Sequence, residues 1–144
     1  MSSSIHVVCA RCEAVNRIGA DRPAQQAVCG KCGEALFAGR PIEIDGAQRF
    51  DKHVARDDMP VIVDFWAPWC APCRAMAPVF ERAARELEPR ARFVKVNVDD
   101  NPDLAARFNV RGIPMIALFR QGKLIAQQAG VVDLDFLRRW AGAL

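Results

Sequence analysis

Two cysteines separated by two residues, Cys70 and Cys73, form the pair on which we expect chemistry to take place. They follow an apolar run at 61–67 and precede an amphipathic helical pattern at 74–87. A sharp turn from strand to helix leaves unpaired backbone N–H groups at the helix start, where the helix dipole favours an anion. A thiol placed there has a lowered pKa, and Pro72 suits the first helical turn because its missing N–H needs no partner. We therefore expect a reversible dithiol/disulfide pair, with Cys73 the more shielded thiol.

Asp64 is the one charged residue in the apolar run before this pair. A carboxylate among Val, Ile, Phe and Trp side chains should have a raised pKa. Because perturbed acids cluster at working sites, we favour a role as a proton relay that serves Cys73 during exchange. The alternative is a structural charge paired with Lys95 on the following strand, and the two roles are compatible.

Four further cysteines form two Cys-x-x-Cys pairs, with 16 residues between the pairs. This spacing is typical of four-cysteine zinc sites, in which each pair forms a knuckle that directs two sulfurs at one tetrahedral centre. We expect one structural zinc ion, which would supply the folding free energy of a segment too polar to fold on a core of its own. The predicted ligands are Cys9, Cys12, Cys29 and Cys32.

The same four cysteines also allow alternatives to zinc. They could form two local disulfides or remain free thiols, and iron could occupy the same sulfur cage. His6 could replace one ligand, although four sulfurs already fill the coordination shell, so an exposed position is expected for it.

The rest of the chain alternates between strand and helix patterns in the order βαβαβαββα. This order gives an α/β fold with a central mixed sheet and helices on both faces. Turn residues and a proline place a boundary near residue 40, between a small module at 1–40 and a domain at 41–144. Asp133 is expected to cap a last helix that carries Leu144 on its apolar face. The expected strands cover 42–44, 61–67, 92–99, 115–119 and 123–129. The expected helices cover 45–56, the segment from the cysteine pair through 87, 102–108 and 134–144.

Composition narrows the function classes. The 144 residues carry a net charge of +3 with both signs interspersed, which does not favour nucleic-acid binding. No apolar run approaches the roughly 18 residues that span a bilayer, and the N-terminus lacks the features of a secretory signal. Six cysteines in such a chain are better interpreted as metal ligands and redox groups than as structural disulfides. We expect a cytoplasmic monomer without nucleic-acid or membrane partners.

Residues 41–144 resemble thioredoxin throughout. The resemblance lies in the apolar run 61–67, Trp-Cys-x-Pro-Cys at 69–73, Lys-Val-Asn-Val-Asp at 95–99, Gly-Ile-Pro at 112–114, and Gly130. These segments in this order are specific, whereas Cys-x-x-Cys alone is a weak signal. The four-cysteine segment resembles the zinc-ribbon extension of the bacterial thioredoxin 2 type. The resemblance thus covers the whole chain and implies a thioredoxin fold with a small N-terminal zinc ribbon.

The resemblance also implies a protein-disulfide reductase that works by dithiol–disulfide exchange on protein substrates. Cys70 would be the nucleophile and Cys73 the resolving thiol, tuned by a buried pair of Asp64 and Lys95. Electrons would come from NADPH-dependent thioredoxin reductase, a flavin enzyme that is a partner, so no bound organic cofactor is expected. A cis form of Pro114 is implied, whereas a loop proline is ordinarily trans. The implied substrate rim consists of Trp69, Ile113, Pro114 and Gly130.

Two positions depart from the family pattern. Ala71 stands where the family usually has Gly, and the redox potential therefore stays open. Met115 replaces the Thr that is common after the cis proline, which affects the groove that binds partners.

Two further functions stay open. The ribbon could recruit a partner to a scaffold or holdase, or the zinc thiolates could serve as a redox sensor.

Overall fold

The computed structural model describes residues 4–143, and a five-stranded mixed sheet forms the centre of the larger domain. In sheet order, the strands are β3 (Ile42–Glu43), β5 (Arg92–Asn97), β4 (Val61–Trp66), β6 (Met115–Arg120) and β7 (Lys123–Ala129). β4 occupies the middle, parallel to β5 and antiparallel to β6. β3 extends the parallel side, and β7 forms a hairpin with β6 at the other edge. The mixed sheet predicted from the sequence is therefore confirmed.

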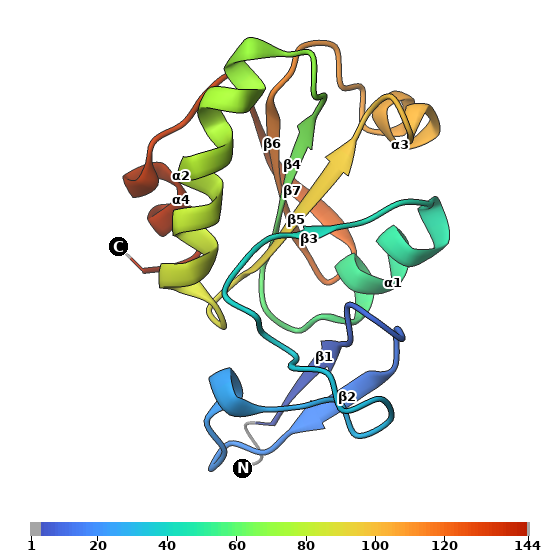
Figure 1. The fold of residues 1–144 in the computed structure, drawn as a ribbon, viewed down its shortest axis with the longest axis vertical. Coiled ribbons are helices and arrows are strands. Elements are labelled where there is room, and N and C mark those ends of the chain that lie inside the picture. The colour runs from blue at the N-terminus through green and yellow to red at the C-terminus, as the bar shows by residue number, and fades with distance from the viewer. Residues whose placement is uncertain (1–3, 144) are drawn as a thin grey trace.

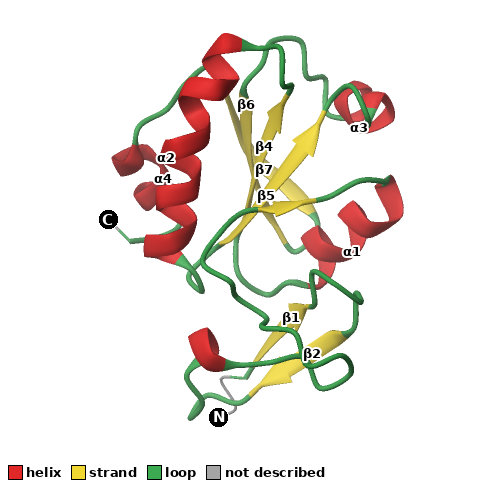
Figure 2. Cartoon of the chain, in the orientation of Figure 1, coloured by secondary structure: helices red, strands yellow, loops and turns green. Residues whose placement is uncertain are grey.

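Helices cover both faces of this sheet, as predicted. They are α1 (Ala47–Arg56), α2 (Ala71–Leu87), α3 (Pro102–Arg107) and α4 (Leu134–Trp140). α2 and α4 cover one face, and α1 and α3 cover the other (Figure 1; Figure 2 separates helices from strands by colour). Within residues 4–143, no helix combines the length and the hydrophobicity that crossing a membrane would require.

Side chains of β4 alternate between the two faces and divide the apolar core into two clusters. Val61, Val63 and Phe65 pack beneath α1 and α3. Ile62 packs on the opposite face, beneath α2 and α4. Asp64 follows two residues later and shares the face of Ile62, so the strand directs one carboxylate toward the α2 side of the sheet.

The predicted elements are present in the predicted order, and the differences lie at their ends. α2 begins at Ala71, directly after Cys70 as predicted, although its amphipathic pattern starts only at 74. The sulfur of Cys70 accepts a hydrogen bond from the Cys73 N–H and caps the helix. α4 ends before Gly142, whose φ of +78° is incompatible with a continuing helix. Leu144, which was expected on the apolar face of this helix, lies outside the described residues.

The N-terminal module is a small ribbon built on an antiparallel hairpin of β1 (Ile5–Val8) and β2 (Val15–Ile18), followed by a 3-10 turn, η1 (Ala24–Gln26). The sequence did not predict these strands, because four-residue strands carry little periodicity. Buried apolar side chains hold the ribbon together, and Met59 of the larger domain completes their cluster. The ribbon therefore packs on the domain, at the end of the sheet where β4 and β5 begin (Figure 1).

Arg92, the first residue of β5, is completely buried where the ribbon meets the domain. Its guanidinium donates hydrogen bonds of 2.6 Å to the Leu36 carbonyl and 2.7 Å to the Val8 carbonyl, both in the ribbon. Asp57 lies 3.8 Å from Arg92 Nε and accepts a hydrogen bond of 2.7 Å from the Val8 N–H. A buried charge is tolerated only with partners of this kind. The ribbon thus supplies the acceptors that keep this cation inside the protein.

The segment that connects the ribbon to β3 is packed against the domain. The Phe37 ring is buried under the Arg92 guanidinium, 5.0 Å from its centroid, and the Gly39 N–H donates a 3.0 Å hydrogen bond to Glu88. The boundary predicted near residue 40 falls within this packed connection. The division into 1–40 and 41–144 itself stays a prediction.

Substitution of Arg92 by methionine tests its role in joining the two parts. Arg92→Met leaves the Val8 and Leu36 carbonyls without their donor, while Asp57 keeps its 2.9 Å contact with His53. We therefore expect the free energy of unfolding to fall by about 2–4 kcal/mol. Urea denaturation followed by circular dichroism measures this loss. The control Arg90→Met removes an exposed arginine nearby and should change the free energy by about 0.5 kcal/mol or less. Equal losses in the two variants would contradict the role of Arg92.

Candidate functional site

The turn from β4 into α2 places Cys70 and Cys73 at the start of the helix, as predicted. A disulfide joins them, with their Cα atoms 5.2 Å apart. The Cys70 sulfur accepts a 3.2 Å hydrogen bond from the Cys73 N–H, one of the donors that a helix start leaves unpaired. This donor and the helix dipole stabilise negative charge on the Cys70 sulfur once the disulfide is reduced. The arrangement suits reversible thiol–disulfide exchange.

A second segment reaches the sulfur pair from the loop before β6. The Ile113 carbonyl oxygen lies 3.6 Å from the Cys70 sulfur, and the Ile113 side chain packs on the cluster that contains both cysteines. The Ile113–Pro114 peptide bond is cis, as the resemblance implied. Gly130, just after β7, has a φ of +91° and donates a 2.8 Å hydrogen bond to the Pro114 carbonyl. Ile113, Pro114 and Gly130 therefore form one continuous edge beside Cys70.

Trp69 lies on the outer side of the pair and is 66% exposed. Its indole Nε1 donates a 2.8 Å hydrogen bond to the Asp99 carboxylate, which fixes the orientation of the ring. Val131, next to Gly130, is also largely exposed. Exposed apolar side chains gathered near a reactive group are typical of a surface that binds another molecule.

Asp64 lies on β4 behind the sulfur pair and is 1% exposed. Neither of its carboxylate oxygens has a hydrogen-bond partner among residues 4–143. Burial raises the pKa of Asp64 to about 7, while the charge of Lys95 lowers that pKa and the charge of Glu43 raises it. Lys95 is the register partner of Asp64 on β5, but its Nζ lies over the Trp66 ring, 4.3 Å from the centroid. Asp64 is thus a buried acid that titrates near neutral pH without a direct ion pair in the described part of the chain.

Sequence reasoning missed two residues near this site. Glu43 is the register partner of Lys95 on β3, and burial raises its pKa as well. Its position between two apolar residues in a short strand was the available signal. Asp99 belongs to the segment at 95–99 on which the resemblance was based, but its bond to Trp69 depends on how the turn after β5 approaches the turn after β4.

The four ribbon cysteines form a second candidate site. Their Sγ atoms all lie within 4.8 Å of one another, and 3.6 Å separates Cys9 from Cys32 and Cys12 from Cys29. A tetrahedral ion with metal–sulfur bonds of about 2.3 Å separates its sulfurs by roughly 3.8 Å. All four are unpaired cysteines, so the two local disulfides are not formed. His6 lies outside the cluster and is bonded to an aspartate of the larger domain. The residues predicted from the spacing therefore fit one metal ion.

Nearby donors complete the sulfur cluster. In each knuckle, the N–H two residues after the first cysteine donates a 3.4 Å hydrogen bond to the sulfur of that cysteine; the donors are Arg11 and Lys31. The side-chain amide of Asn16 adds a 3.4 Å hydrogen bond to Cys29. Gly33 closes the second knuckle at a φ of +79°, a conformation that glycine adopts without steric cost. Such donors stabilise thiolates, the form in which cysteine binds a metal.

The two sites lie at opposite ends of the sheet. The ribbon contacts Arg92 at the start of β5, whereas the sulfur pair follows the end of the parallel neighbour β4. A strand of this length spans about 20 Å. Figure 1 shows the same separation, with the ribbon at the bottom and the start of α2 at the top. Among residues 4–143, the groups that contact the Cys70–Cys73 pair therefore belong to the larger domain.

Comparisons with known protein families give two matches, each to a different part of the chain. The family described as thioredoxin matches residues 42–143. The family described as thioredoxin 2, N-terminal, a zinc ribbon, matches residues 8–34. The first range contains the sulfur pair with its surrounding residues, and the second contains all four ribbon cysteines.

Individual relatives agree with these matches. The chain is 38% identical over 134 residues to thioredoxin C-3 of Corynebacterium nephridii, covering 93% of this chain and 91% of that protein. It is 45% identical over 88 residues to the thioredoxin of Porphyra purpurea, covering 61% and 82%. A solved mutant thioredoxin from Halobacterium salinarum matches with a TM-score of 0.67 at 32% identity, covering 73% and 90%. The chain therefore belongs to the thioredoxin family, is of the zinc-ribbon thioredoxin 2 type, and is a thiol–disulfide oxidoreductase that reduces protein disulfides.

Proposed function

We propose that Cys70 is the nucleophile of this disulfide reductase and that Cys73 is the resolving thiol. The observation that carries the assignment is the hydrogen bond from the Cys73 N–H to the Cys70 sulfur at the helix start. This donor stabilises a thiolate on Cys70 specifically. Cys73 lies further into the helix and is the more buried of the two, at 2% exposure against 5%. Cys70 is therefore the sulfur better placed to meet a substrate.

The exchange takes place in two steps. The Cys70 thiolate attacks one sulfur of the substrate disulfide, a mixed disulfide forms, and the other substrate sulfur leaves as a thiolate. Cys73 then loses its proton and attacks the Cys70 sulfur, so the internal disulfide forms and the second substrate thiolate leaves. Two electrons have passed from the cysteine pair to the substrate. We propose that an NADPH-dependent flavin reductase, thioredoxin reductase, returns the pair to the dithiol state.

Asp64 is the group that we propose to accept the Cys73 proton. It lies on the face of β4 that α2 covers, between Ile62 in the cluster beneath α2 and Trp66 in the cluster around the cysteines. Its pKa of about 7 matches the range in which a general base works best at neutral pH. Lys95 adjusts this pKa through its charge rather than through a direct bond.

The substrate rim consists of the exposed Trp69 and the edge formed by Ile113, Pro114 and Gly130. An extended substrate segment would bind beside Ile113 through strand-like backbone hydrogen bonds, a common way of recognising peptides. The contact between the Ile113 carbonyl and the Cys70 sulfur supports this placement, because a segment bound there lies next to the nucleophile. Met115 follows this edge and would contribute to its selectivity.

The metal in the ribbon is, in our proposal, one structural zinc ion. Four sulfur donors at tetrahedral spacing form a closed site without an open coordination position, which is typical of structural zinc. The ion would stabilise a ribbon whose own apolar cluster is small. We also propose that residues 1–40 and 41–144 form two domains of a cytoplasmic monomer without nucleic-acid or membrane partners. Ribbon cysteines that form no disulfide agree with a reducing compartment.

Serine substitutions separate the roles of the two sulfurs. Cys70→Ser should abolish reduction of insulin disulfides, because no nucleophile remains. Cys73→Ser should stop at the mixed disulfide and accumulate covalent complexes that are visible on non-reducing gels. Turbidity of reduced insulin measures turnover. Retained turnover in the Cys70 variant, or no trapped complex in the Cys73 variant, would exclude the assignment.

Asp64→Asn tests the buried acid through the pH dependence of stability. The folded pKa of about 7 exceeds the ordinary value of 3.8, so the folded protein holds this proton more tightly. The contribution of Asp64 to stability is therefore present below about pH 4 and lost as pH rises through 7. Between pH 5 and 8, the stability of the variant relative to the unmodified protein should rise by about 2–3 kcal/mol.

Urea denaturation of both oxidised proteins at the two pH values measures this shift. Glu88, whose pKa burial also raises to about 7, is present in both proteins and cancels in the difference. The control Glu43→Gln removes the other acid near Lys95. Burial raises its pKa in the same direction, but Glu43 lies on the edge strand β3 and is more accessible to solvent than Asp64, so the shift should be smaller. Parallel pH profiles for the Asp64 variant and the unmodified protein would contradict the raised pKa.

Metal analysis tests the ribbon site. The purified protein should contain about one zinc ion per chain, and Cys29→Ser should lower this content below about half because one of four sulfur donors is lost. Cys70→Ser is the matched control and should leave the content unchanged. Amide NMR spectra of the Cys29 variant should lose the ribbon signals and keep those of β4. Full zinc content in that variant would exclude the site, and iron in its place would exclude zinc.

A further inference from the structure

The two knuckles of the ribbon have the same hydrogen-bond pattern. In each, the backbone N–H and C=O of one valine point away from the hairpin. The defining hydrogen bonds are Cys9 N–H to Ala14 C=O and Cys29 N–H to Glu34 C=O. Val8 and Val28 directly precede the first cysteine of each knuckle, so they occupy equivalent positions. Because bonded pairs alternate along an antiparallel hairpin, both valines direct their N–H and C=O outward.

The larger domain covers this outward edge in the first knuckle. The Val8 N–H donates a 2.7 Å hydrogen bond to the Asp57 carboxylate, and the Val8 carbonyl accepts a 2.7 Å hydrogen bond from Arg92. Val8 is completely buried as a result. In the first knuckle, the outward N–H of the valine is therefore bonded to a carboxylate of the same chain.

The equivalent edge in the second knuckle is open. Val28 is 58% exposed, and its N–H and C=O have no hydrogen bond with any residue from 4 to 143. An unpaired, exposed backbone edge accepts an extended segment of another chain, as in strand addition. The N–H and C=O of Val28 are thus available to a second molecule, in the same way that those of Val8 bind the larger domain.

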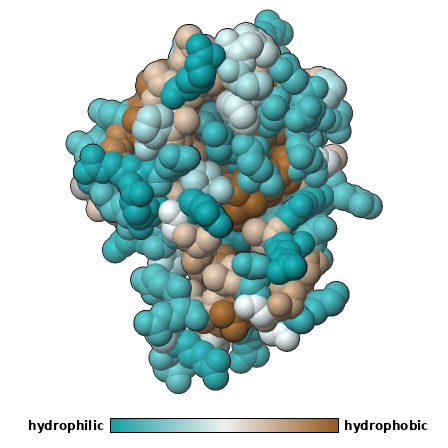
Figure 3. Space-filling model, in the orientation of Figure 1, coloured by the Kyte–Doolittle hydropathy of each residue, from teal (hydrophilic) through white to brown (hydrophobic). Residues whose placement is uncertain are grey.

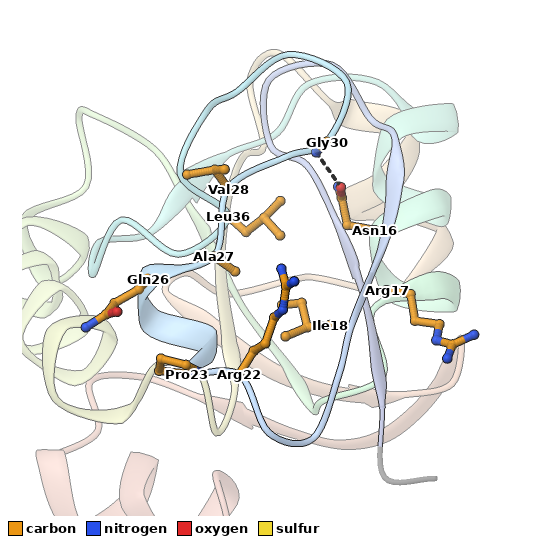
Figure 4. A pocket seen from close by; sticks show the side chains of 10 residues that line it. All are labelled: Asn16, Arg17, Ile18, Arg22, Pro23, Gln26, Ala27, Val28, Gly30 and Leu36. Carbon is orange, nitrogen blue, oxygen red and sulfur yellow. Dashed lines mark hydrogen bonds between the residues drawn. The ribbon is translucent and has the colours of Figure 1, made fainter.

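A cavity of about 410 Å³ lies along this edge, between β2 and the segment that carries η1 (Figure 4). Its size falls within the range of ligand-binding sites. Ile18 and Leu36 give it an apolar base, and Arg22 extends across it, whereas the Arg17 side chain points away (Figure 4). Figure 3 shows hydrophobic atoms that reach the surface over the ribbon, among hydrophilic side chains.

The charge of this groove is positive and uncompensated. Among the described residues, no acidic side chain lines the cavity. The Arg22 guanidinium makes no hydrogen bond or ion pair with any residue from 4 to 143. A guanidinium beside apolar surface and free backbone groups is complementary to a carboxylate on an extended peptide.

We propose that this groove binds an extended, acidic segment of a partner protein. The segment would pair with the backbone of Val28, place a carboxylate against Arg22, and cover Ile18 and Leu36 with an apolar side chain. A basic segment would be repelled by Arg22, and a helix would leave the Val28 edge unpaired. The groove lies at the end of the molecule opposite to Cys70, so this binding does not depend on the redox activity.

The test uses the full-length, oxidised, metal-loaded protein and two fluorescein-labelled octapeptides, one of alternating Val and Glu and one of alternating Val and Lys. Fluorescence anisotropy should detect binding of the acidic peptide and none of the basic peptide. Arg22→Glu should weaken the binding about tenfold or more, because it replaces the cation with a like charge. The matched control Arg17→Glu makes the same charge change on a side chain that points away, and should weaken binding less than about threefold.

A second variant, and an NMR map of the peptide-binding residues, make the test independent of charge. Val28→Pro removes one outward N–H, a change tolerated at a free strand edge, and should also weaken binding about tenfold, with metal content confirming the fold. Amide NMR shifts on adding the acidic peptide should include Val28 and Ile18. The proposal would be overturned by no binding of the acidic peptide, by equal losses in the two arginine variants, or by shifts confined to Trp69 and Ile113.

Discussion

β4 is hydrogen-bonded along both edges, to β5 in parallel and to β6 in antiparallel register, and this pairing fixes the position of the reactive sulfur. A shift of one residue would move its apolar side chains from one core cluster to the other, so the register is strongly specified. The position of Cys70, which follows the end of this strand, is therefore fixed relative to the sheet. β6 is held by the same strand, and the loop before it brings Ile113 to that sulfur.

The sheet also contains two buried ionisable residues, of which one has hydrogen-bond partners and the other has none among residues 4–143. Arg92, where β5 begins, has two carbonyl acceptors and a nearby aspartate. Asp64, toward the reactive end of β4, has no hydrogen-bond partner among residues 4–143, and burial raises its pKa to about 7. A satisfied cation contributes to holding two parts of a protein together. An unsatisfied acid destabilises its charged form, which makes it able to take up a proton.

Sequence patterns predicted most of the larger domain because its strands are buried and its helices are amphipathic. The cysteine spacing likewise placed the four ribbon sulfurs together, since each knuckle is a local structure. The ribbon hairpin was missed because its four-residue strands carry too little periodicity. The bonds from Arg92 to the ribbon and from Trp69 to Asp99 join segments far apart in the chain. No local pattern marks them, and Arg92 looked like an ordinary residue at the start of an alternating strand.

The guanidinium at the start of β5 has an evolutionary consequence. Its acceptors belong to the ribbon, so gain or loss of residues 1–40 by simple fusion or deletion would change the stability of the larger domain. Without the ribbon, Arg92 would lose the carbonyls that bind it, which would lower the free energy of unfolding by several kcal/mol. We therefore expect relatives that lack the extension to carry another residue at this position, and an arginine there to accompany the ribbon through the family's history.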